Sequence, residues 1–206
     1  MSEKYTDIES QASYGIGYQM GQQLASNPFD GLVLEDVIDG FRSGFAGSPL
    51  DVSKEALNAA FEEIQQRMTR SNSEKHADTI KQGEEFLENN AKREEVTVTS
   101  SGLQYEVINS GDGATPGLSS TVRTHYHGTL IDGSVFDSSY DRGQPAEFPV
   151  NGVIKGWTEA LQLMKVGDKL RLYVPYNLAY GEQGAGAAIG PYTTLIFDVE
   201  LLDIVS

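Results

Sequence analysis

Apolar side chains recur at three- and four-residue steps through the first 50 residues, a pattern typical of amphipathic helices. The segment Thr6-Asp7-Ile8-Glu9 has the form of a capping box, with Thr6 as the N-cap, and predicts a first helix over about 7–25. Asn27-Pro28 then breaks the chain. A second helix, ending at Gly47-Ser48-Pro49, is predicted by the apolar stripe Leu34, Val37, Ile38, Phe41 and Phe45.

A third helical stripe begins near Ser53 and is followed by a more polar stretch that stays free of proline up to Arg93. Its apolar positions are Leu57, Phe61, Ile64 and Met68, then Ile80, Phe86 and Leu87. A continuous helix of this extent has about 40 residues and is roughly 60 Å long at 1.5 Å per residue. Because its second half is polar nearly all round, the pattern predicts a solvent-bridging arm.

Beyond residue 96 the apolar positions alternate, which predicts strands at 103–107, 121–130, 169–174 and 195–201. Asp132-Gly133 is a strong hairpin dipeptide. A short helix from about Val153 places Trp157, Leu161 and Met164 on one face. The predicted fold class is α+β: an N-terminal all-α region and long helical arm, followed by an antiparallel sheet curled over one short helix. The predicted domains are 1–50, 51–95 and 96–206.

The composition of the chain argues against several classes of function. The chain has 206 residues with 30 acidic and 15 basic side chains, a net charge of -15, which argues against binding to nucleic acid or an anionic membrane. It has no cysteine, which excludes thiol nucleophiles, disulfides and cysteine zinc sites. The N-terminus shows no signal-peptide pattern, and no apolar run is long enough to span a bilayer. We therefore expect a cytoplasmic protein that does not act at a membrane.

Two motifs raise the question of a metal or phosphate site. His125 and His127 lie on one face of a predicted strand, but no third ligand stands at a useful spacing, so groove-lining histidines are the favoured interpretation. Gly184-Ala185-Gly186 lacks the Lys-Ser/Thr ending of a phosphate loop and is interpreted as a turn. No metal and no cofactor is predicted. Gly17 and Gly21 have GxxxG spacing, which favours the close approach of another helix.

The segment VFDSSYDRG at 135–143 combines an apolar ring, a carboxylate, a phenol and a guanidinium within a few residues. Asp, Ser and Gly favour turns, so the segment alone predicts only a loop. Six aromatic residues lie near strand ends, loops or the start of the short helix, and each taken alone is more often core than site. They are Tyr126, Phe136, Phe148, Trp157, Tyr180 and Phe197.

Four segments of the C-terminal half carry a family resemblance in their order and spacing. They are HYHGTLIDGSVFDSSYDRG at 125–143, VIKGWTEALQLMKVGDK at 153–169, PYNLAYGEQGAGAAIGP at 175–191 and TLIFDVELLDI at 194–204. They resemble the FKBP family of peptidyl-prolyl cis/trans isomerases over about half of the chain. The N-terminal half looks like the dimerising extension of the macrophage-infectivity-potentiator-like FKBPs, chiefly through ASYGIG at 12–17.

The resemblance implies an enzyme for Xaa-Pro bonds that needs neither metal nor cofactor. It implies Trp157 as the pocket floor, with apolar walls from Tyr126, Phe136, Val153, Ile154, Ile189 and Phe197, and Phe148 beside them. It also implies that the Tyr180 hydroxyl and the backbone N–H of Ile154 hold the substrate. Asp137 either acts on the substrate carbonyl or orients the pocket, with Arg142 neutralising it; the alternative is that the two form a structural loop clamp.

Two departures from the family pattern predict a smaller, more mobile pocket rim: Ala146 and the stretch Ala185-Gly186-Ala187-Ala188. The expected partners are proline-containing peptides, unfolded or partly folded proteins, and macrolides such as rapamycin and tacrolimus. A homodimer through the N-terminal helices is expected, because their apolar stripes have little chain of their own to cover them. Its cleft would hold a folding chain while prolines isomerise. The competing class is a non-catalytic proline-binding chaperone or scaffold with the same pocket.

Overall fold

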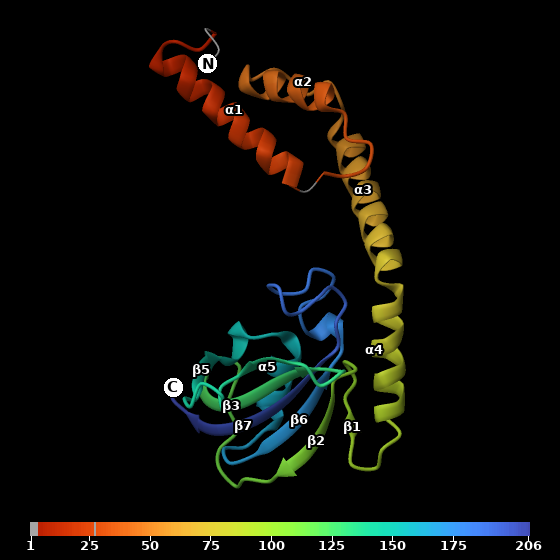
Figure 1. Cartoon of the computed structure of the whole chain (residues 1–206), viewed down its shortest axis with the longest axis vertical. Coiled ribbons are helices and arrows are strands. Elements are labelled where there is room, and N and C mark those ends of the chain that lie inside the picture. The colour runs from red at the N-terminus through yellow and green to blue at the C-terminus, as the bar shows by residue number, and fades with distance from the viewer. Residues whose placement is uncertain (1–3, 27) are drawn as a thin grey trace. The chain divides into compact units, whose positions relative to one another are not determined.

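The computed structural model describes residues 4–26 and 28–206, which form two compact units, Met1–Met68 and Thr69–Ser206. Figure 1 labels most of the helices and strands of both units. Within the described residues, no helix is both long and apolar enough to cross a membrane.

The first unit is helical, as the apolar stripes predict. It contains α1 (Ile8–Ser26), α2 (Leu34–Phe45) and the larger part of α3 (Lys54–Lys75). None of the described side chains in these three helices is buried. The apolar stripe of α2 lies exposed, and the rings of Phe41 and Phe45 stack with their centroids 6.1 Å apart.

The start of α1 differs from the predicted capping box by one position. Helix α1 begins at Ile8, and the Asp7 carboxylate accepts a 2.7 Å hydrogen bond from the backbone N–H of Ser10. Asp7 is therefore the capping residue in place of Thr6, and this hydrogen bond lowers the pKa of its carboxyl. Both residue types serve as N-caps, so the sequence pattern alone did not distinguish them.

The second unit contains a seven-stranded antiparallel sheet (Figure 1) with the strand order β1-β2-β6-β7-β3-β4 and with β5 paired to β3. Helix α5 (Lys155–Leu163) and two 3₁₀ turns, Val150–Gly152 and Tyr176–Leu178, complete it. This arrangement confirms the predicted α+β fold class. The strands are β1 (Thr97–Val98), β2 (Gln104–Asn109), β3 (Thr121–Leu130), β4 (Val135–Ser138), β5 (Ala146–Pro149), β6 (Lys169–Val174) and β7 (Leu195–Ile204).

The hydrophobic core lies between α5 and one face of the sheet, here called the inner face. Alternate residues of β3 and β7 are buried, as period-two patterning requires. Trp157, Leu161 and Met164 are buried together, which confirms the apolar face predicted for the short helix. Gly156 lets α5 approach the sheet, because a Cβ there would lie 2.6 Å from the Val174 Cγ1 atom.

The long third helix predicted from the sequence is divided. Helix α3 ends at Lys75 and α4 (Ala77–Asn90) follows, with His76 between them at φ -111° and ψ 18°. The prediction of a solvent-bridging arm is wrong for α4, which belongs to the second unit and buries Gly83 and Asn90. The reason is that its partners, including Tyr173 and Gln104, are distant in sequence. The domain boundaries at 50 and 95 stay predictions.

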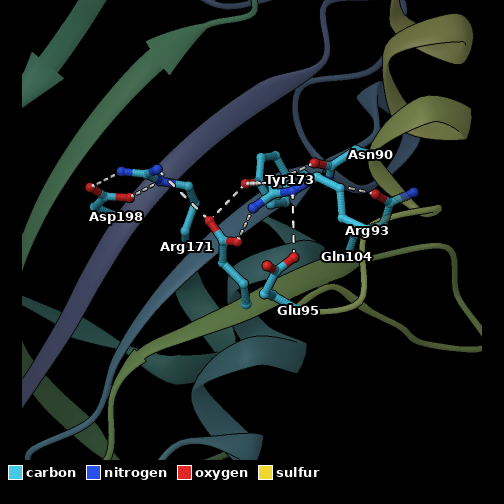
Figure 2. Close-up of polar contacts among 8 residues, drawn as sticks. Asn90, Arg93, Glu95, Gln104, Arg171, Tyr173 and Asp198 are labelled. Carbon is cyan, nitrogen blue, oxygen red and sulfur yellow. Dashed lines mark hydrogen bonds and ion pairs between the residues drawn. The ribbon is translucent and has the colours of Figure 1, made fainter.

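A polar network joins the end of α4 to the outer face of the sheet, and Figure 2 shows it in detail. Arg93 donates hydrogen bonds to Glu106 at 2.6 Å and to the Tyr173 hydroxyl at 2.8 Å. Tyr173 in turn donates to Glu106 at 2.9 Å, and Asn90 donates to Gln104 at 2.9 Å. The Glu106 side chain is only 8% exposed, and its nearly buried carboxylate is paired with Arg93 at 2.6 Å and with Arg171 at 3.8 Å.

Replacing Arg93 with alanine is expected to lower the free energy of unfolding by about 2 kcal/mol, less than the 3–5 kcal/mol of a fully buried pair because Arg93 is half-exposed. Denaturant titration of the full chain measures this change. Lys92→Ala is the matched control, because the Lys92–Glu88 pair is exposed on both sides, and its effect should stay within about 0.5 kcal/mol. Equal effects of the two variants would contradict an anchoring role for the network.

Candidate functional site

The inner face of the sheet carries a cluster of aromatic rings around Trp157. The Trp157 ring, 4% exposed, meets Tyr126, Phe148 and Phe197 edge-on, with centroids 5.3, 5.7 and 5.3 Å away. Phe136 meets Phe197 edge-on at 5.4 Å. Edge-to-face packing is a favoured geometry for aromatic pairs. Five of the six aromatic residues singled out in the sequence therefore come together, with Trp157 at the centre.

A glycine on β3 permits this packing. A Cβ on Gly128 would lie 2.6 Å from the Phe136 Cζ atom and 3.1 Å from the Phe197 Cε1 atom. Register explains the approach, since Gly128 pairs with Phe197 on β7 and with Asp137 on β4. The sequence analysis missed Gly128, although a glycine inside an alternating strand is a recognised signal for the close approach of other groups.

Asp137, Tyr126 and Arg142 form a hydrogen-bonded group beside the rings. The Tyr126 hydroxyl donates to Asp137 at 2.5 Å, while Arg142 donates to the other oxygen of Asp137 and, at 2.8 Å, to the Tyr126 hydroxyl. The Arg142 guanidinium also lies over the Tyr126 ring, 5.5 Å from its centroid. The expected contact between Asp137 and Arg142 is present, and Tyr126, predicted as a wall of the catalytic pocket, is its third member.

The same contacts set the protonation of this group. Burial opposes ionisation of Asp137, but the hydrogen bonds from Tyr126 and Arg142 and the Arg142 charge outweigh it, so the pKa of the carboxyl lies below its ordinary value. Burial, and then the hydrogen bond to Asp137, raises the pKa of the Tyr126 hydroxyl. At neutral pH the site therefore holds a carboxylate, a neutral phenol and a guanidinium.

Ser139 holds the segment 135–143 in place and was missed in the sequence analysis. Its hydroxyl, fully buried, accepts a 2.8 Å hydrogen bond from the backbone N–H of Tyr126, and its own N–H donates to the Tyr126 carbonyl at 2.9 Å. Gly143, at φ +66°, donates to the Tyr140 carbonyl at 2.9 Å and turns the chain back. This turn brings Arg142 to Asp137. The first residues, 135–138, form strand β4 in place of the predicted loop.

The remaining residues predicted to bind substrate fall into two groups. Val153 and Ile154 are partly buried against the hydrophobic core that contains Trp157, and Ile189, 7% exposed, belongs to that core. Ile154 is the N-cap of α5. Tyr180 is different, because it is 41% exposed and lies outside the cluster of packed residues. The structure thus brings together the predicted walls and floor, and leaves Tyr180 on an exposed segment near them.

The two histidines have separate surroundings on the outer face of β3. His125 shares a 2.9 Å hydrogen bond with the Ser139 hydroxyl and stacks on Tyr140 at 4.6 Å. His127 lines an open pocket of about 430 Å³ between α4 and the sheet. Among the described residues, no group of three or more acidic or histidine side chains is arranged to hold a metal ion. The pocket is lined by Phe86, Asn90, Arg93, His127, Thr129, Arg171, Tyr173, Ile196 and Asp198.

Charges in this outer pocket are compensated within it. Arg171 forms a two-point contact with Asp198, at 2.6 and 2.8 Å, and the hydrogen bonds to Asp198 raise the Arg171 pKa. Arg93 is held by Glu106 and Tyr173 (Figure 2). The outer pocket is therefore explained by the attachment of α4, and the aromatic cluster on the inner face is the candidate functional site.

Comparison with protein families finds a match in each half of the chain. Residues 113–202 match the family of the FKBP-type peptidyl-prolyl cis-trans isomerase, and residues 9–107 match the domain amino terminal to FKBP-type peptidyl-prolyl isomerase.

Individual proteins match over nearly the whole length. The FKBP-type 22 kDa peptidyl-prolyl cis-trans isomerase of Escherichia coli is 50% identical over 200 residues, covering 97% of each chain. The outer membrane protein MIP of Legionella longbeachae is 39% identical over 204 residues, covering 97% of this chain and 87% of that protein. Among solved structures, FkpA from Escherichia coli aligns with a TM-score of 0.62 and 35% identity, covering 97% and 98% of the two chains.

Proposed function

Because the chain belongs to the family of FKBP-type peptidyl-prolyl cis-trans isomerases, we propose that its aromatic cluster binds the proline of an Xaa-Pro segment and accelerates rotation of the preceding amide. The chain is an isomerase of this type, and its family binds proline-containing peptides and proteins. The observation that carries the assignment of the site is the packing of Tyr126, Phe148 and Phe197 around Trp157. These residues would form the floor and walls for an apolar ring.

The reaction needs no bond to break. Rotating a peptide bond passes through a twisted state without amide resonance, over a barrier of about 18–20 kcal/mol. Only contacts that are stronger in that twisted state accelerate the rotation. An apolar pocket does this by excluding water from the amide carbonyl oxygen, which carries more negative charge in the planar state than in the twisted state. Each 1.36 kcal/mol by which the pocket stabilises the twisted state over the planar state raises the rotation rate about tenfold.

Polar groups at the pocket edge would fix the substrate. In the proposal, the Tyr180 hydroxyl and the backbone N–H of Ile154, at the start of α5, donate to substrate carbonyls. The Asp137 carboxylate, held by Tyr126 and Arg142, faces the carbonyl that leaves the amide plane. Because Asp137 stays ionised, its charge is available throughout the neutral pH range.

The experiment for this function measures the cis-to-trans rate of short peptides containing Leu-Pro-Phe or Ala-Pro-Phe with the full chain. Acceleration proportional to enzyme concentration, and suppressed by rapamycin, supports the enzyme and its pocket. Absence of acceleration by folded protein with every residue tested before proline would leave the non-catalytic proline-binding module. Macrolide binding is part of the proposal, and Ala146 and the stretch 185–188 predict a weaker grip than a larger rim would give.

We further propose that the first unit forms a homodimer. Its support is the exposure of apolar side chains on two helices: Tyr14, Tyr18 and Met20 on α1 are 52, 56 and 47% exposed, and Phe41 and Phe45 on α2 are 51 and 87% exposed. Exposed apolar stripes of this kind are typical of surfaces that a partner covers. A second copy of the chain is the proposed partner, since identical patches meet across a two-fold axis.

The dimer has a sharp test. Wild type should sediment at twice the 22.4 kDa mass of the chain, and Phe45→Glu should raise the dimer dissociation constant by about 30-fold or more, the equivalent of losing a 2 kcal/mol hot spot. Glu35→Ala, an exposed change on the same helix, is the control and should leave the dimer intact. A wild type that is monomeric at micromolar concentration would refute the homodimer.

The proposed holding role depends on that dimer, because two weak sites on one scaffold raise the effective concentration of the second site. Phe45→Glu should keep the wild-type rate on short peptides and lose the advantage in refolding a protein limited by proline isomerisation. Equal refolding rates for the two proteins would exclude the holding role. The cytoplasmic location stays a prediction, and cell fractionation tests it; one relative at 39% identity is named an outer membrane protein.

A further inference from the structure

The loop at 181–194 connects Tyr180 to β7 and contributes Ile189 to the hydrophobic core beside the candidate site. Ile189 from this loop is 7% exposed and belongs to the hydrophobic core that also contains Trp157 and Phe197. Its N–H and carbonyl form two hydrogen bonds with Ala185, at 3.2 and 2.8 Å. Gly184, at φ +68°, is required beneath this pair, because a Cβ there would lie 2.2 Å from the Ile189 carbonyl oxygen. The position of Ile189 therefore depends on how the whole loop is held.

Tyr192 is the point at which the loop is fixed. It is the sole non-glycine residue with positive φ in the described chain, at +57°, a conformation that needs support from its surroundings. Its backbone N–H donates a 2.9 Å hydrogen bond to the Gly181 carbonyl, directly after Tyr180. Its ring is 2% exposed and packs against Tyr176 at 5.2 Å and His76 at 5.8 Å.

Two residues at the junction of α3 and α4, far away in sequence, contact this loop. His76, between the two helices, contacts the Tyr192 ring. Asn72, in the last turn of α3, donates to the Glu182 carbonyl at 3.2 Å. Burial, followed by the Glu182 carboxylate, raises the pKa of the Tyr192 hydroxyl, which places that hydroxyl inside this contact region.

A third support lies at the other end of the loop. Gly83 on α4 is buried, and a Cβ added there would lie 2.6 Å from the Thr194 Oγ1 atom. Thr194 is itself 3% exposed and stands directly before β7, which carries Phe197. The polar network around Arg93 fixes the C-terminal end of α4 on the sheet (Figure 2). Helix α4 therefore has a fixed position from which to support the loop.

We propose that the helical segment 72–83 is a positioning element of the isomerase site, with His76 and Gly83 as its two principal residues. Neither touches the aromatic pocket. Through Tyr192 and Thr194 they set the loop that presents Tyr180 and Ile189, and thereby the preference for the residue before proline. This inference rests on the proposed function and adds to it a determinant of substrate selectivity that lies outside the C-terminal domain predicted from the sequence.

The distinctive consequence is a change in selectivity. A variant that only destabilises the fold lowers activity on all peptides by the same factor, namely the folded fraction. A displaced loop changes the ratio of kcat/KM for Leu-Pro to kcat/KM for Ala-Pro peptides, because displacements of about 1 Å in a site alter rates strongly. The ratio therefore separates positioning from stability.

The experiment compares full-length variants at a temperature where each is folded by circular dichroism. His76→Ala and Gly83→Ala should each change the Leu-Pro to Ala-Pro ratio by about threefold or more. His76→Phe keeps a ring against Tyr192 and should restore the ratio. Gly83→Ala combined with Thr194→Ala removes the atom that the new Cβ meets and should also restore it. Glu84→Ala, an exposed neighbour on α4, is the control with an unchanged ratio.

The possible outcomes distinguish failure of the positioning role from failure of the proposed isomerase function. Active wild type together with His76→Ala and Gly83→Ala variants of wild-type ratio would overturn the positioning role and leave the isomerase site intact. Ratios that shift equally in Glu84→Ala would overturn it as well. Inactive wild type would remove the proposed function, and the inference with it.

Discussion

Trp157→Ala is expected to lower the free energy of unfolding by about 3–5 kcal/mol, the range for truncating a large buried aromatic side chain. The ring is 4% exposed and loses edge-on contacts with three other rings in this variant. Single domains are stable by only about 5–15 kcal/mol, so the change is a large part of the total. Denaturant titration followed by far-ultraviolet circular dichroism measures it.

A matched control lies on the same helix. Leu163 is also on α5 but is 51% exposed, so Leu163→Ala should cost less than about 1 kcal/mol. Trp157→Phe keeps an aromatic ring at the floor and is the variant for activity measurements, because it should remain folded. A loss of stability in Trp157→Ala no greater than in Leu163→Ala would show that the ring cluster is not the centre of the core.

The second large effect concerns Asp137. Asp137→Ala should reduce kcat/KM by roughly 10- to 100-fold, corresponding to the 1.5–3 kcal/mol of hydrogen bonds to charged groups. It removes the acceptor of the Tyr126 and Arg142 hydrogen bonds together with the charge facing the substrate. Asp141→Ala, an exposed carboxylate in the same loop, is the control and should keep wild-type kcat/KM.

Arg142→Ala distinguishes direct action from a structural clamp. If Asp137 acts on the substrate, Arg142→Ala leaves the carboxylate in place through Tyr126 and lowers kcat/KM less than Asp137→Ala does. If the pair is only a loop clamp, both variants should lower kcat/KM by the same factor. Equal losses would therefore assign Asp137 a structural role.

The pH dependence follows from the same contacts. The pKa of Asp137 is lowered in the folded protein, so its stabilising contribution is complete above the ordinary value of 3.8 and is lost as the pH falls through the lower folded value. We expect kcat/KM to be independent of pH between about 5 and 8 as far as this carboxyl is concerned. A titration of activity with a midpoint in that range would contradict the assignment of Asp137 as the ionised group.

The sequence predicted the parts of the fold whose signal is local. Strands β3 and β7 were predicted, β7 only as far as residue 201, because sustained alternation determines which side of a strand faces the core. The face of α5 followed from the spacing of Trp157, Leu161 and Met164. Strands β1, β4 and β5 were missed, since two to four residues are too few to show a period.

What the sequence did not predict depends on contacts between distant residues. Helix α4 looked solvent-exposed because the residues it buries are Gly83 and Asn90, whose partners Thr194 and Gln104 lie in other segments. The motif resemblance identified the ring cluster and the Asp137–Arg142 pair. It did not identify Ser139, whose buried hydroxyl holds the loop that makes the pair possible. A residue such as Ser139, which acts by positioning other side chains, leaves no periodic pattern of apolar positions in the sequence.

The most direct test of the central claim uses the only tryptophan in the chain, Trp157, as a reporter of the pocket. Its fluorescence is recorded while a Leu-Pro-Phe peptide is titrated, and the isomerisation rate is measured over the same concentrations. We predict catalysis whose rate saturates at the peptide concentration at which the Trp157 emission change saturates, within about twofold when chemistry is slower than dissociation. Saturating catalysis with unchanged Trp157 emission would place the reaction elsewhere and contradict the account.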